Sequence, residues 1–556
     1  MGKLLSNKFS LFLGILLILN IVQAYFTPLI YDETYYWYYS QNMAWGYFDH
    51  PPMVAVLAKL SGFLFKGEIG VRLLGCLMGA GTLSLLWSLV EAKNKERQIP
   101  LFFLLAFSMV LFNAYGFLTL PDTPLLFFSA LFLWLYKRFL HENTILIAIL
   151  LGICMACLLY SKYHAVLVIF FVFLSNLKLV FNKYAWLAVF MALAAYSPHF
   201  YWLTENNFVS VKYHLFERPN QPYEFDEFTL GYLLNLIVNF GLLFPWFYWA
   251  LFKTKSKDSF QKSLLYLSYG IILFFFLSSF HRRAQAQWVI AICAPMLLLT
   301  FNYFSQDRFT KKWLWRIGIF GTVLIFYTRA WLVYHPLIPF MGYETHGPKE
   351  WVETLSNIVG DTPVVFENSY RRAPMYSFYS GKPAFSLNNI RYRRNQYSID
   401  SSEYFFQHKK VAYVTPYASS GEFSYVPFRT NRYYGWYLND FQSFRKLKCL
   451  LDGDIATISK KKQTLRICNP YNTDISLDSL KMNVAYLDQY KDIIEIKPIA
   501  LQRVNQKGNV LKAKDTTVFR LTFPEPEKQH PSFLKFSISE NGLISGLNSE
   551  SIKVTK

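Results

Sequence analysis

Residues 9–30 read FSLFLGILLILNIVQAYFTPLI, and the seven residues that follow, 31–37, read YDETYYW. The first stretch is long enough to cross a bilayer as an α-helix, which needs about 20 mostly apolar residues. The second stretch places two adjacent carboxylates among four aromatic rings at the end of that helix. Because charged groups are costly inside lipid, we expect this pair at the membrane surface.

The rest of the first 340 residues repeats this pattern of apolar runs joined by short polar loops. The chain is 53% hydrophobic and only 17% charged, which is too apolar for an ordinary soluble protein. We therefore expect about eleven membrane-spanning helices. They correspond to residues 9–30, 70–91, 100–118, 119–137, 145–161, 164–181, 184–203, 229–252, 262–280, 285–304 and 313–334.

The net charge of +20 is distributed as in a membrane protein, not as in a nucleic-acid-binding protein. Most Lys and Arg residues lie in alternate loops, which are cytoplasmic by the positive-inside rule. The partners we expect are therefore membrane lipids and no nucleic acid. The basic residues of these loops are Lys3, Lys8, Lys93, Lys95, Arg97, Lys137, Arg138, Lys178, Lys183, Lys253, Lys255, Lys257, Arg308, Lys311 and Lys312.

The opposite, extracytoplasmic side receives the loop 31–69 and everything after about Tyr334, where long apolar runs stop. We expect a membrane domain over 1–340, an α/β region over 341–445 and a β-rich module over 446–556. The predicted elements include a helix over 348–358 and strands over 363–367, 411–414 and 517–521. Cys449 and Cys468 lie in this outer region, where a disulfide between them is possible.

The acidic pair Asp32 and Glu33 is a candidate catalytic site. A carboxylate at this depth can accept a proton from a hydroxyl group. The alternative is a helix cap surrounded by interfacial aromatic rings such as Tyr35, which are common at membrane surfaces. His50 precedes an amphipathic stripe over 53–64 that is too short to span the membrane and should lie flat in the interface. His50 is either a hydrogen-bond donor to a phosphate or sugar, or a capping side chain.

Further charged residues fall on the same outer side. Asp122 lies at the tip of a helical hairpin, and Lys162 lies at the outer end of the next helix, where snorkelling is the alternative explanation. Arg282 and Arg283 oppose the positive-inside trend, so we expect them to bind an anion such as a lipid phosphate. The cysteines show no metal-ligand spacing, and we expect neither a metal nor another cofactor.

These features resemble bacterial glycosyltransferase family 39, the dolichyl-phosphate-mannose-protein mannosyltransferase-like group, and its aminoarabinose-transferase relatives. The resemblance covers about residues 10–305. It rests on the acidic pair, the aromatic outer loop with its Pro pair, the stretch Gly70-Val71-Arg72-Leu73-Leu74-Gly75, and Gln287-Trp288 before an apolar helix. The segment 365–397 is similar to the region after the membrane domain in some bacterial members.

This resemblance implies a GT-C fold and inverting transfer of a sugar from a polyprenyl phosphate to a hydroxyl acceptor on a glycan, lipid or protein. It implies a bacterial inner-membrane protein with a periplasmic C-terminal domain. Asp32 would then be the general base, supported by Glu33 and Asp122. His50 and Tyr35 would help to position donor or acceptor, and three cations would bind the lipid phosphate. Those cations are Lys162, Arg282 and Arg283.

One departure concerns the residues before the Pro pair. Aminoarabinose transferases usually carry Glu-Lys there, whereas this chain has Asp49 and His50, which puts that sugar and the lipid A acceptor in doubt. A polyprenyl-linked lipid or polysaccharide transporter is the alternative function, although its charges would be expected along the spans. A non-catalytic scaffold for the outer domain would leave the outer charged residues unexplained.

Overall fold

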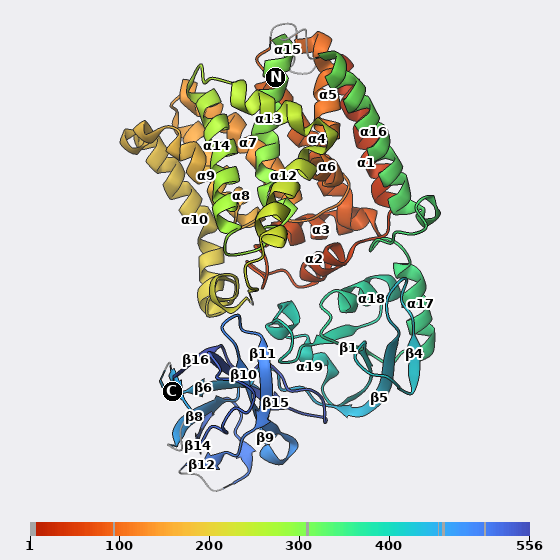
Figure 1. Ribbon diagram of the computed structural model, residues 1–556, viewed down its shortest axis with the longest axis vertical. Helices are drawn as coiled ribbons and strands as arrows, with labels where there is room; N and C mark the ends of the chain where they lie inside the picture. Colours follow the sequence, from red (N-terminus) through yellow and green to blue (C-terminus); the bar gives the residue numbers. More distant parts are fainter. Residues whose placement is uncertain are drawn as a thin grey trace. The chain divides into compact units, whose positions relative to one another are not determined.

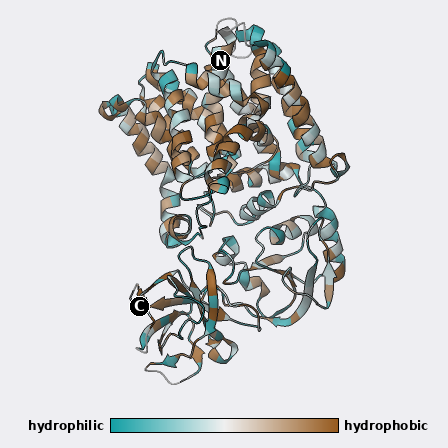
Figure 2. Cartoon of the chain, viewed as in Figure 1, coloured by the Kyte–Doolittle hydropathy of each residue, from teal (hydrophilic) through white to brown (hydrophobic). Residues whose placement is uncertain are grey.

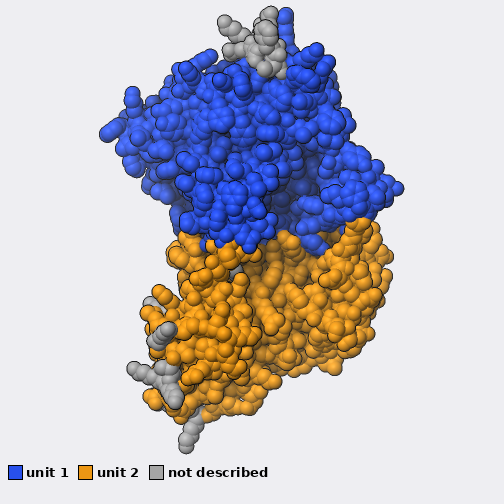
Figure 3. Space-filling view, viewed as in Figure 1, with its two compact units in different colours: residues 1–207, 223–346 blue, residues 208–222, 347–556 orange. Residues whose placement is uncertain are grey.

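The computed structural model describes residues 7–92, 95–218, 220–306, 311–453, 455–458, 462–504 and 508–555. Lys3, Lys93 and Arg308 of the predicted cytoplasmic loops lie outside these residues. The chain divides into two compact units (Figures 1 and 3). Unit 1 comprises 1–207 and 223–346, and unit 2 comprises 208–222 and 347–556.

Unit 1 is a bundle of apolar helices. Among the described residues, seven of its helical segments are long and apolar enough to cross a membrane, and hydrophobic residues predominate along the helices of the bundle (Figure 2). The chain is thus a multi-pass integral membrane protein, as the sequence predicts. The seven segments are Asn7–Phe26 (α1), Ile69–Leu89 (α4), Asp122–His141 (α7), Asp226–Lys253 (η4, α12, η5 and α13), Ser259–Ser278 (α14), Ala286–Ser305 (η6 and most of α15) and Lys311–Val333 (α16).

The remaining helices of unit 1 are shorter or less apolar. Some predicted spans are broken. The run 100–118 divides at Met109, whose backbone is extended, with φ −75° and ψ 106°. The Ser108 hydroxyl there donates to the Leu105 carbonyl at 2.7 Å and so competes with the helical ladder. The shorter or less apolar helices of unit 1 are Tyr31–Gln41 (α2), Met53–Leu64 (α3), Lys95–Gln98 (η1), Ile99–Ser108 (α5), Val110–Ala114 (α6), Ile145–Ser161 (α8), Ala165–Leu174 (α9), Leu177–Phe181 (η2), Lys183–Glu205 (α10) and His335–Leu337 (η7).

The helices α2 and α3 run across one end of the bundle (Figure 1). The predicted short helix over 53–64 is confirmed by α3, which buries Val54 and Leu57 against its neighbours. Its opposite face exposes Phe63 and Leu64, by 73% and 64%. An apolar face left uncovered on a 12-residue helix is typical of a helix lying in the membrane interface.

Unit 2 begins with an α/β region whose five-stranded sheet has the order β2-β1-β3-β5-β4. Strands β1, β2 and β3 are parallel. The predicted helix and the first two predicted strands are confirmed by α17, β1 and β3. The elements are Pro348–Val359 (α17), Val364–Glu367 (β1), Arg372–Ser380 (α18), Ala384–Leu387 (β2), Gln396–Ser398 (η8), Glu403–Phe406 (α19), Lys409–Thr415 (β3), Phe423–Tyr425 (β4) and Tyr433–Phe441 (β5).

A β-rich module follows, with sheets ordered β11-β10-β15-β16-β7 and β12-β14-β8-β6 and a short β13-β9 pair. Their inner faces share a core that contains Leu465, Tyr486 and Phe536. The predicted strand over 517–521 is confirmed by β14. The elements are Lys448–Leu451 (β6), Ile455–Thr457 (β7), Gln463–Cys468 (β8), Ile475–Ser476 (β9), Leu477–Ser479 (η9), Lys481–Leu487 (β10), Ile493–Pro498 (β11), Gln502–Arg503 (β12), Val510–Leu511 (β13), Thr516–Leu521 (β14), Phe533–Ser539 (β15) and Ile552–Thr555 (β16).

The segment 208–222, read from sequence as part of an outer loop of the membrane domain, folds with unit 2. It forms Val209–Lys212 (α11) and Tyr213–Glu217 (η3). The Glu217 carboxylate accepts a hydrogen bond from the Ser551 hydroxyl at 2.9 Å and lies 3.4 Å from the Lys535 ammonium. Burial alone would raise the pKa of Glu217, but Lys535, Lys491 and the hydrogen bonds from Ser551 together outweigh burial and lower it. This ionic contact ties the segment to the β-rich module.

The disulfide considered between Cys449 and Cys468 is not formed, and both are free thiols. The two residues lie on the paired strands β6 and β8, but Cys449 is opposite Ile467, and Cys468 is opposite Lys448. Because side chains alternate across a sheet, this one-residue offset directs the two thiols to opposite faces. Cys449 is buried in the core, whereas Cys468 accepts a hydrogen bond from the Thr516 hydroxyl.

We expect all six cysteines to be alkylated when the protein is denatured without reductant. Intact-mass spectrometry should show six additions of an alkylating agent, and prior reduction should not change that number. Two fewer additions in the unreduced sample would contradict the observed register of β6 and β8.

Candidate functional site

The predicted catalytic residue Glu33 is fully buried and forms an ion pair with Arg72, which is also fully buried. Its Oε1 accepts from Arg72 Nε at 2.7 Å and from the Thr119 amide at 2.9 Å. Its Oε2 accepts from Arg72 Nη2 at 2.5 Å and from the Ile30 amide at 3.2 Å. A carboxylate has about four lone-pair sites, so these contacts occupy all of them.

The Arg72 guanidinium is likewise saturated. Beyond its two bonds to Glu33, Nη1 donates to the carbonyls of Ala24, at 2.9 Å, and Thr27. Nη2 donates to the Pro28 carbonyl at 3.1 Å. A guanidinium has five N–H donors, and five acceptors surround this one. The pair therefore fixes the end of α1, the start of α2, the first turn of α4 and the turn before α7.

Asp32 precedes this anchor in the first turn of α2 and is half-buried. The start of α2 is held by a bond from the Tyr31 amide to Glu344 Oε2 at 3.0 Å. The Tyr115 side chain lies within electrostatic range of both Asp32 and Asp122. Two acids that are 90 residues apart in sequence thus face a common tyrosine.

Asp122 and Lys162 form a direct ion pair. Lys162 Nζ lies 2.7 Å from Asp122 Oδ1, and the two side chains are only 6% and 5% exposed. The start of α7 and the end of α8 supply them, so the helical hairpin brings the two residues together. A lysine ammonium has three donors, and Asp122 takes one of them. The site thus holds a buried ammonium with donors left for an anion.

Tyr35 and His50 lie in an aromatic cluster on the first outer loop. The Tyr35 hydroxyl donates to Asp49 Oδ2 at 3.0 Å, and the Tyr39 hydroxyl approaches the same oxygen at 3.4 Å. The His50 ring packs edge-on against Tyr36, with ring centroids 5.6 Å apart. Burial raises the pKa of the Tyr39 hydroxyl well above its usual value, so it stays a hydrogen-bond donor. This cluster thus holds several polar groups on closely packed rings.

The two predicted phosphate-binding arginines differ in placement. Arg283 is 65% exposed and pairs with Glu227 at 3.1 Å, while Arg282 is half-buried just after α14. The same segment contacts the Lys162 region, because the Trp288 ring lies 5.3 Å from the ring of His164. Of the two, Arg282 has the burial expected for an anion-binding side chain.

Several polar residues of this region carried no assigned role in the sequence. Arg72 and Asp49 were visible only as parts of motifs. Arg329 is 3% exposed near the end of α16, inside an apolar run, which is the signal that could have identified it. His199 is fully buried in α10, with its Nδ1 2.7 Å from the carbonyl oxygen of Trp45. Only the folded chain shows what these side chains contact.

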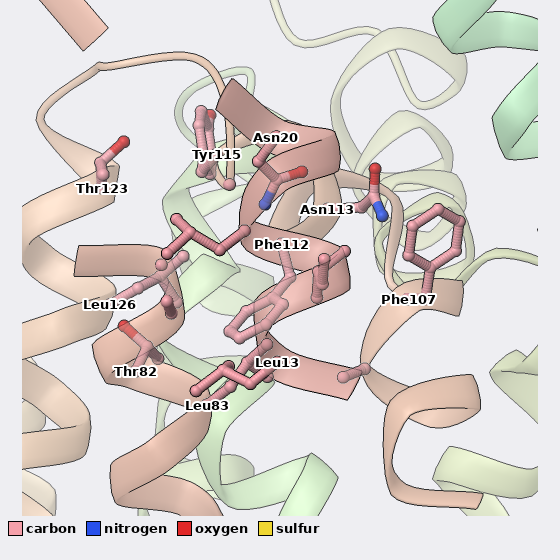
Figure 4. Close-up of a pocket in the computed structure, with 16 residues that line it drawn as sticks. Leu13, Asn20, Thr82, Leu83, Phe107, Phe112, Asn113, Tyr115, Thr123 and Leu126 are labelled. Carbon is pink, nitrogen blue, oxygen red and sulfur yellow. The ribbon is translucent and has the colours of Figure 1, made fainter. Parts of the chain in front are cut away.

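A small cavity of about 30 Å³ lies beside the acids, between α1, α4, α7 and the α5–α6 segment (Figure 4). Tyr115, Asn20, Asn113 and Thr123 lie toward one end of it, and Leu13 lies toward the other (Figure 4). Its volume suits water molecules and is too small for a sugar ring. Among the residues that the structure describes, no group of three or more His, Cys, Asp or Glu could hold a metal ion.

Comparison with known proteins identifies a solved structure that shares the fold of most of this chain. Residues 49–202 match the family described as dolichyl-phosphate-mannose-protein mannosyltransferase, which confirms the predicted resemblance. The crystal structure of ArnT from Cupriavidus metallidurans in the apo state is 14% identical and covers 77% of this chain and 97% of its own, with a TM-score of 0.57. The same protein bound to undecaprenyl phosphate is 13% identical with the same coverage and a TM-score of 0.52.

A curated relative is the lipid A galacturonosyltransferase RgtD from Rhizobium johnstonii. It is 24% identical over 291 residues, which cover 48% of this chain and 58% of RgtD. The chain thus spans somewhat more than half the length of this relative. The fold shared with ArnT is a membrane domain of many helices, followed here by a region of mixed β-sheets.

We expect the substitution Arg72→Met to destabilise the protein by about 3–5 kcal/mol, because it leaves the Glu33 carboxylate buried without its cation. The thermal unfolding midpoint of the detergent-solubilised protein measures this effect. The double substitution Arg72→Met with Glu33→Leu should recover part of the loss. Arg138→Gln removes an exposed pair with Glu142 and should change stability by less than about 1 kcal/mol. Equal midpoints for Arg72→Met and wild type would refute the anchoring role.

Proposed function

We propose that this protein is a membrane glycosyltransferase that moves a sugar from a polyprenyl phosphate to a hydroxyl acceptor outside the cytoplasm, with inversion. The observation that carries the proposal is the position of its buried charges. Among the described residues of unit 1, every buried Asp, Glu, Lys or Arg lies at or near a helix end on the side that sequence assigns to the exterior. These residues are Glu33, Asp49, Arg72, Asp122, Lys162 and Arg329.

This distribution favours an enzyme over a transporter. A protein that moves a charged lipid through the membrane needs polar groups along its path, at several depths. Here the charges gather at one end of the bundle, and the helical segments beyond them are apolar. A site at one membrane surface, with an apolar bundle beneath it, suits a reaction on a lipid-linked head group.

In this reaction, Asp32 is the general base. The acceptor hydroxyl attacks the anomeric carbon, the bond from that carbon to the phosphate oxygen breaks, and Asp32 takes the hydroxyl proton. Asp32 is the acid of this site that is partly open to solvent, whereas Glu33 is saturated by Arg72. We therefore assign Glu33 to positioning and not to contact with substrate. Such a base contributes about 10²–10⁴-fold to rate.

Lys162 and Arg282 bind the lipid phosphate. Negative charge grows on the leaving oxygen as the glycosyl bond breaks, so nearby cations stabilise the transition state more than the ground state. Asp122 holds the Lys162 ammonium in place through the 2.7 Å contact. No step needs a nucleotide or a metal, because the leaving group is already a phosphate held by side-chain cations.

The relatives support a choice of donor and acceptor class to test first. One solved relative binds undecaprenyl phosphate, and RgtD acts on lipid A, so an isoprenoid phosphate carrier and a glycolipid acceptor are the first choices to test. The Tyr35 and Asp49 cluster is placed to bind sugar hydroxyls, with His50 beside it. We place the site and unit 2 outside the cytoplasm, as the loop charges predict, and on the periplasmic side of a bacterial inner membrane, as the family resemblance implies.

Asp32→Asn should reduce sugar transfer by about 10²–10⁴-fold, because an amide cannot accept the proton. The measurement is transfer of labelled sugar from a panel of undecaprenyl-phosphate sugars into an envelope extract by reconstituted protein. Asp226→Asn is the matched control, since Asp226 is an exposed acid in a first helical turn of the same unit. Full activity in Asp32→Asn would exclude this base, and absence of transfer by wild type with every donor would favour the transporter.

Lys162→Gln should reduce transfer by about 10²–10³-fold through lost stabilisation of the leaving phosphate. It also leaves Asp122 buried without its cation, so some loss of stability will accompany it. The double substitution Lys162→Gln with Asp122→Asn separates the two effects. It should restore the unfolding midpoint without restoring transfer. Recovery of both the unfolding midpoint and sugar transfer would show that Lys162 has only a structural role. The control Arg283→Gln should leave transfer within about twofold of wild type.

A further inference from the structure

The parallel strands of unit 2 create a second place where a ligand can bind. Strand β1 pairs with β2 on one side and β3 on the other, all three in parallel. The chain leaves β1 through α18 to reach β2, and later returns to the other side of β1 as β3. The strand order therefore reverses at β1. In open α/β sheets, ligands bind outside the carboxyl ends of the strands at such a point.

A rigid set of polar side chains lies at this edge. Glu367 ends β1, and its Oε1 accepts from Asn389 Nδ2 at 2.6 Å. The backbone N–H of Asn389 donates to Asn368 Oδ1 at 2.9 Å. Asn388 joins the set through a 2.9 Å bond from the Ser386 hydroxyl. These five polar residues are each at most 9% exposed, so they fix the loops after β1 and β2.

Tyrosine and arginine side chains lie over this set and reach solvent; we call them the carboxyl-edge cluster. The Arg393 guanidinium lies 4.4 Å from the Tyr370 ring centre. The rings of Tyr370 and Tyr392 are 6.4 Å apart. Arg371, Arg393 and Tyr417 all lie within electrostatic range of the Tyr392 hydroxyl. The cluster thus comprises Tyr370, Arg371, Tyr392, Arg393 and Tyr417.

Tyr417 connects the two sets of residues. It follows β3, is 68% exposed, and lies within electrostatic range of the Glu367 carboxylate and close to the Asn368 side chain. An exposed aromatic ring beside buried polar side chains can serve as a platform for a ligand. Arg371 is also exposed, and its guanidinium lies 5.9 Å from the Tyr370 ring centre, so an aromatic ring and a cation are presented together.

This chemistry defines the ligand. An aromatic face carries partial negative charge and attracts the C–H face of a sugar ring. Arginine recognises carboxylate and phosphate groups through paired hydrogen bonds. We infer that the carboxyl-edge cluster binds an anionic saccharide, with the tyrosines against the sugar ring and Arg371 and Arg393 on its carboxylate or phosphate. The inference goes beyond the proposed function, because binding in unit 2 requires neither the donor nor transfer.

The test uses the full chain in lipid nanodiscs and saturation-transfer difference NMR. The probes are glucose 6-phosphate and digalacturonate as charged saccharides, maltose as the neutral one, and inorganic phosphate as the bare anion. Both charged saccharides should bind at least about tenfold more tightly than maltose, which corresponds to about 1.4 kcal/mol. The Asp32→Asn variant should bind them equally well, so failure of the proposed transfer reaction would not affect this result.

Two variants locate the site. Arg371→Gln with Arg393→Gln should weaken the charged saccharides about tenfold and leave maltose unchanged. Tyr417→Ala should weaken all three saccharides. The matched control, Arg466→Gln with Arg520→Gln, removes the same charge from exposed positions on β8 and β14 and should bind like wild type. Unfolding midpoints show whether each variant is folded. If the double glutamine variant is not folded, Arg371→Lys with Arg393→Lys is used in its place.

Two outcomes would overturn the inference. If the arginine and Tyr417 variants bind the charged saccharides like wild type, the cluster is not the site. If inorganic phosphate binds as tightly as glucose 6-phosphate, and Tyr417→Ala has no effect, then the cluster holds an anion without recognising a sugar.

Discussion

The ion pair between Arg72 and Glu33 is the constraint on which the end of unit 1 that carries α2 and α3 depends. Moving both charges out of water costs several kcal/mol for each ion, and the cost is recovered only with good geometry and satisfied hydrogen bonds. Here five acceptors meet the guanidinium, and four donors meet the carboxylate. Because these partners come from the end of α1, the start of α2 and the turn before α7, the pair sets where Asp32 and Asp122 begin their helices.

A second buried cation extends this network. Arg329 on α16 donates to Asn20 Oδ1 at 2.9 Å and lies 4.5 Å from the Phe117 ring centre. Its backbone carbonyl accepts from Gln23 Nε2, which also donates to Thr27, and the Thr27 carbonyl accepts from Arg72. A chain of polar contacts thus runs from α16 to the acidic site. The last membrane helix is thereby coupled to the first, and the position of α2 depends on both.

Hydropathy predicted most of unit 1, because lipid imposes the same apolar requirement on every span. Hydropathy could not predict the break at Met109, because that break depends on a local hydrogen bond of the Ser108 side chain. It also could not predict that 208–222 folds with unit 2, because this depends on contacts between Glu217 and lysines more than 270 residues away. The predicted topology placed Asp122 and Lys162 on the same side of the membrane, but it did not predict that they are in contact. Alternation predicted β14, while the free thiol of Cys449 followed from a one-residue register that sequence does not specify.

The two buried ion pairs, Arg72 with Glu33 and Lys162 with Asp122, differ in how many of their hydrogen-bonding positions are occupied. Every donor of Arg72 and every acceptor position of Glu33 is occupied, so a substrate could bind there only by breaking the anchor. Lys162 gives one of its three donors to Asp122 and keeps an ammonium that an anion can share. Adjacent acids can therefore differ in role although their sequence context is the same. All hydrogen-bonding positions of Glu33 are occupied within the fold, so our proposal assigns the chemistry to Asp32, one residue earlier and partly open to solvent.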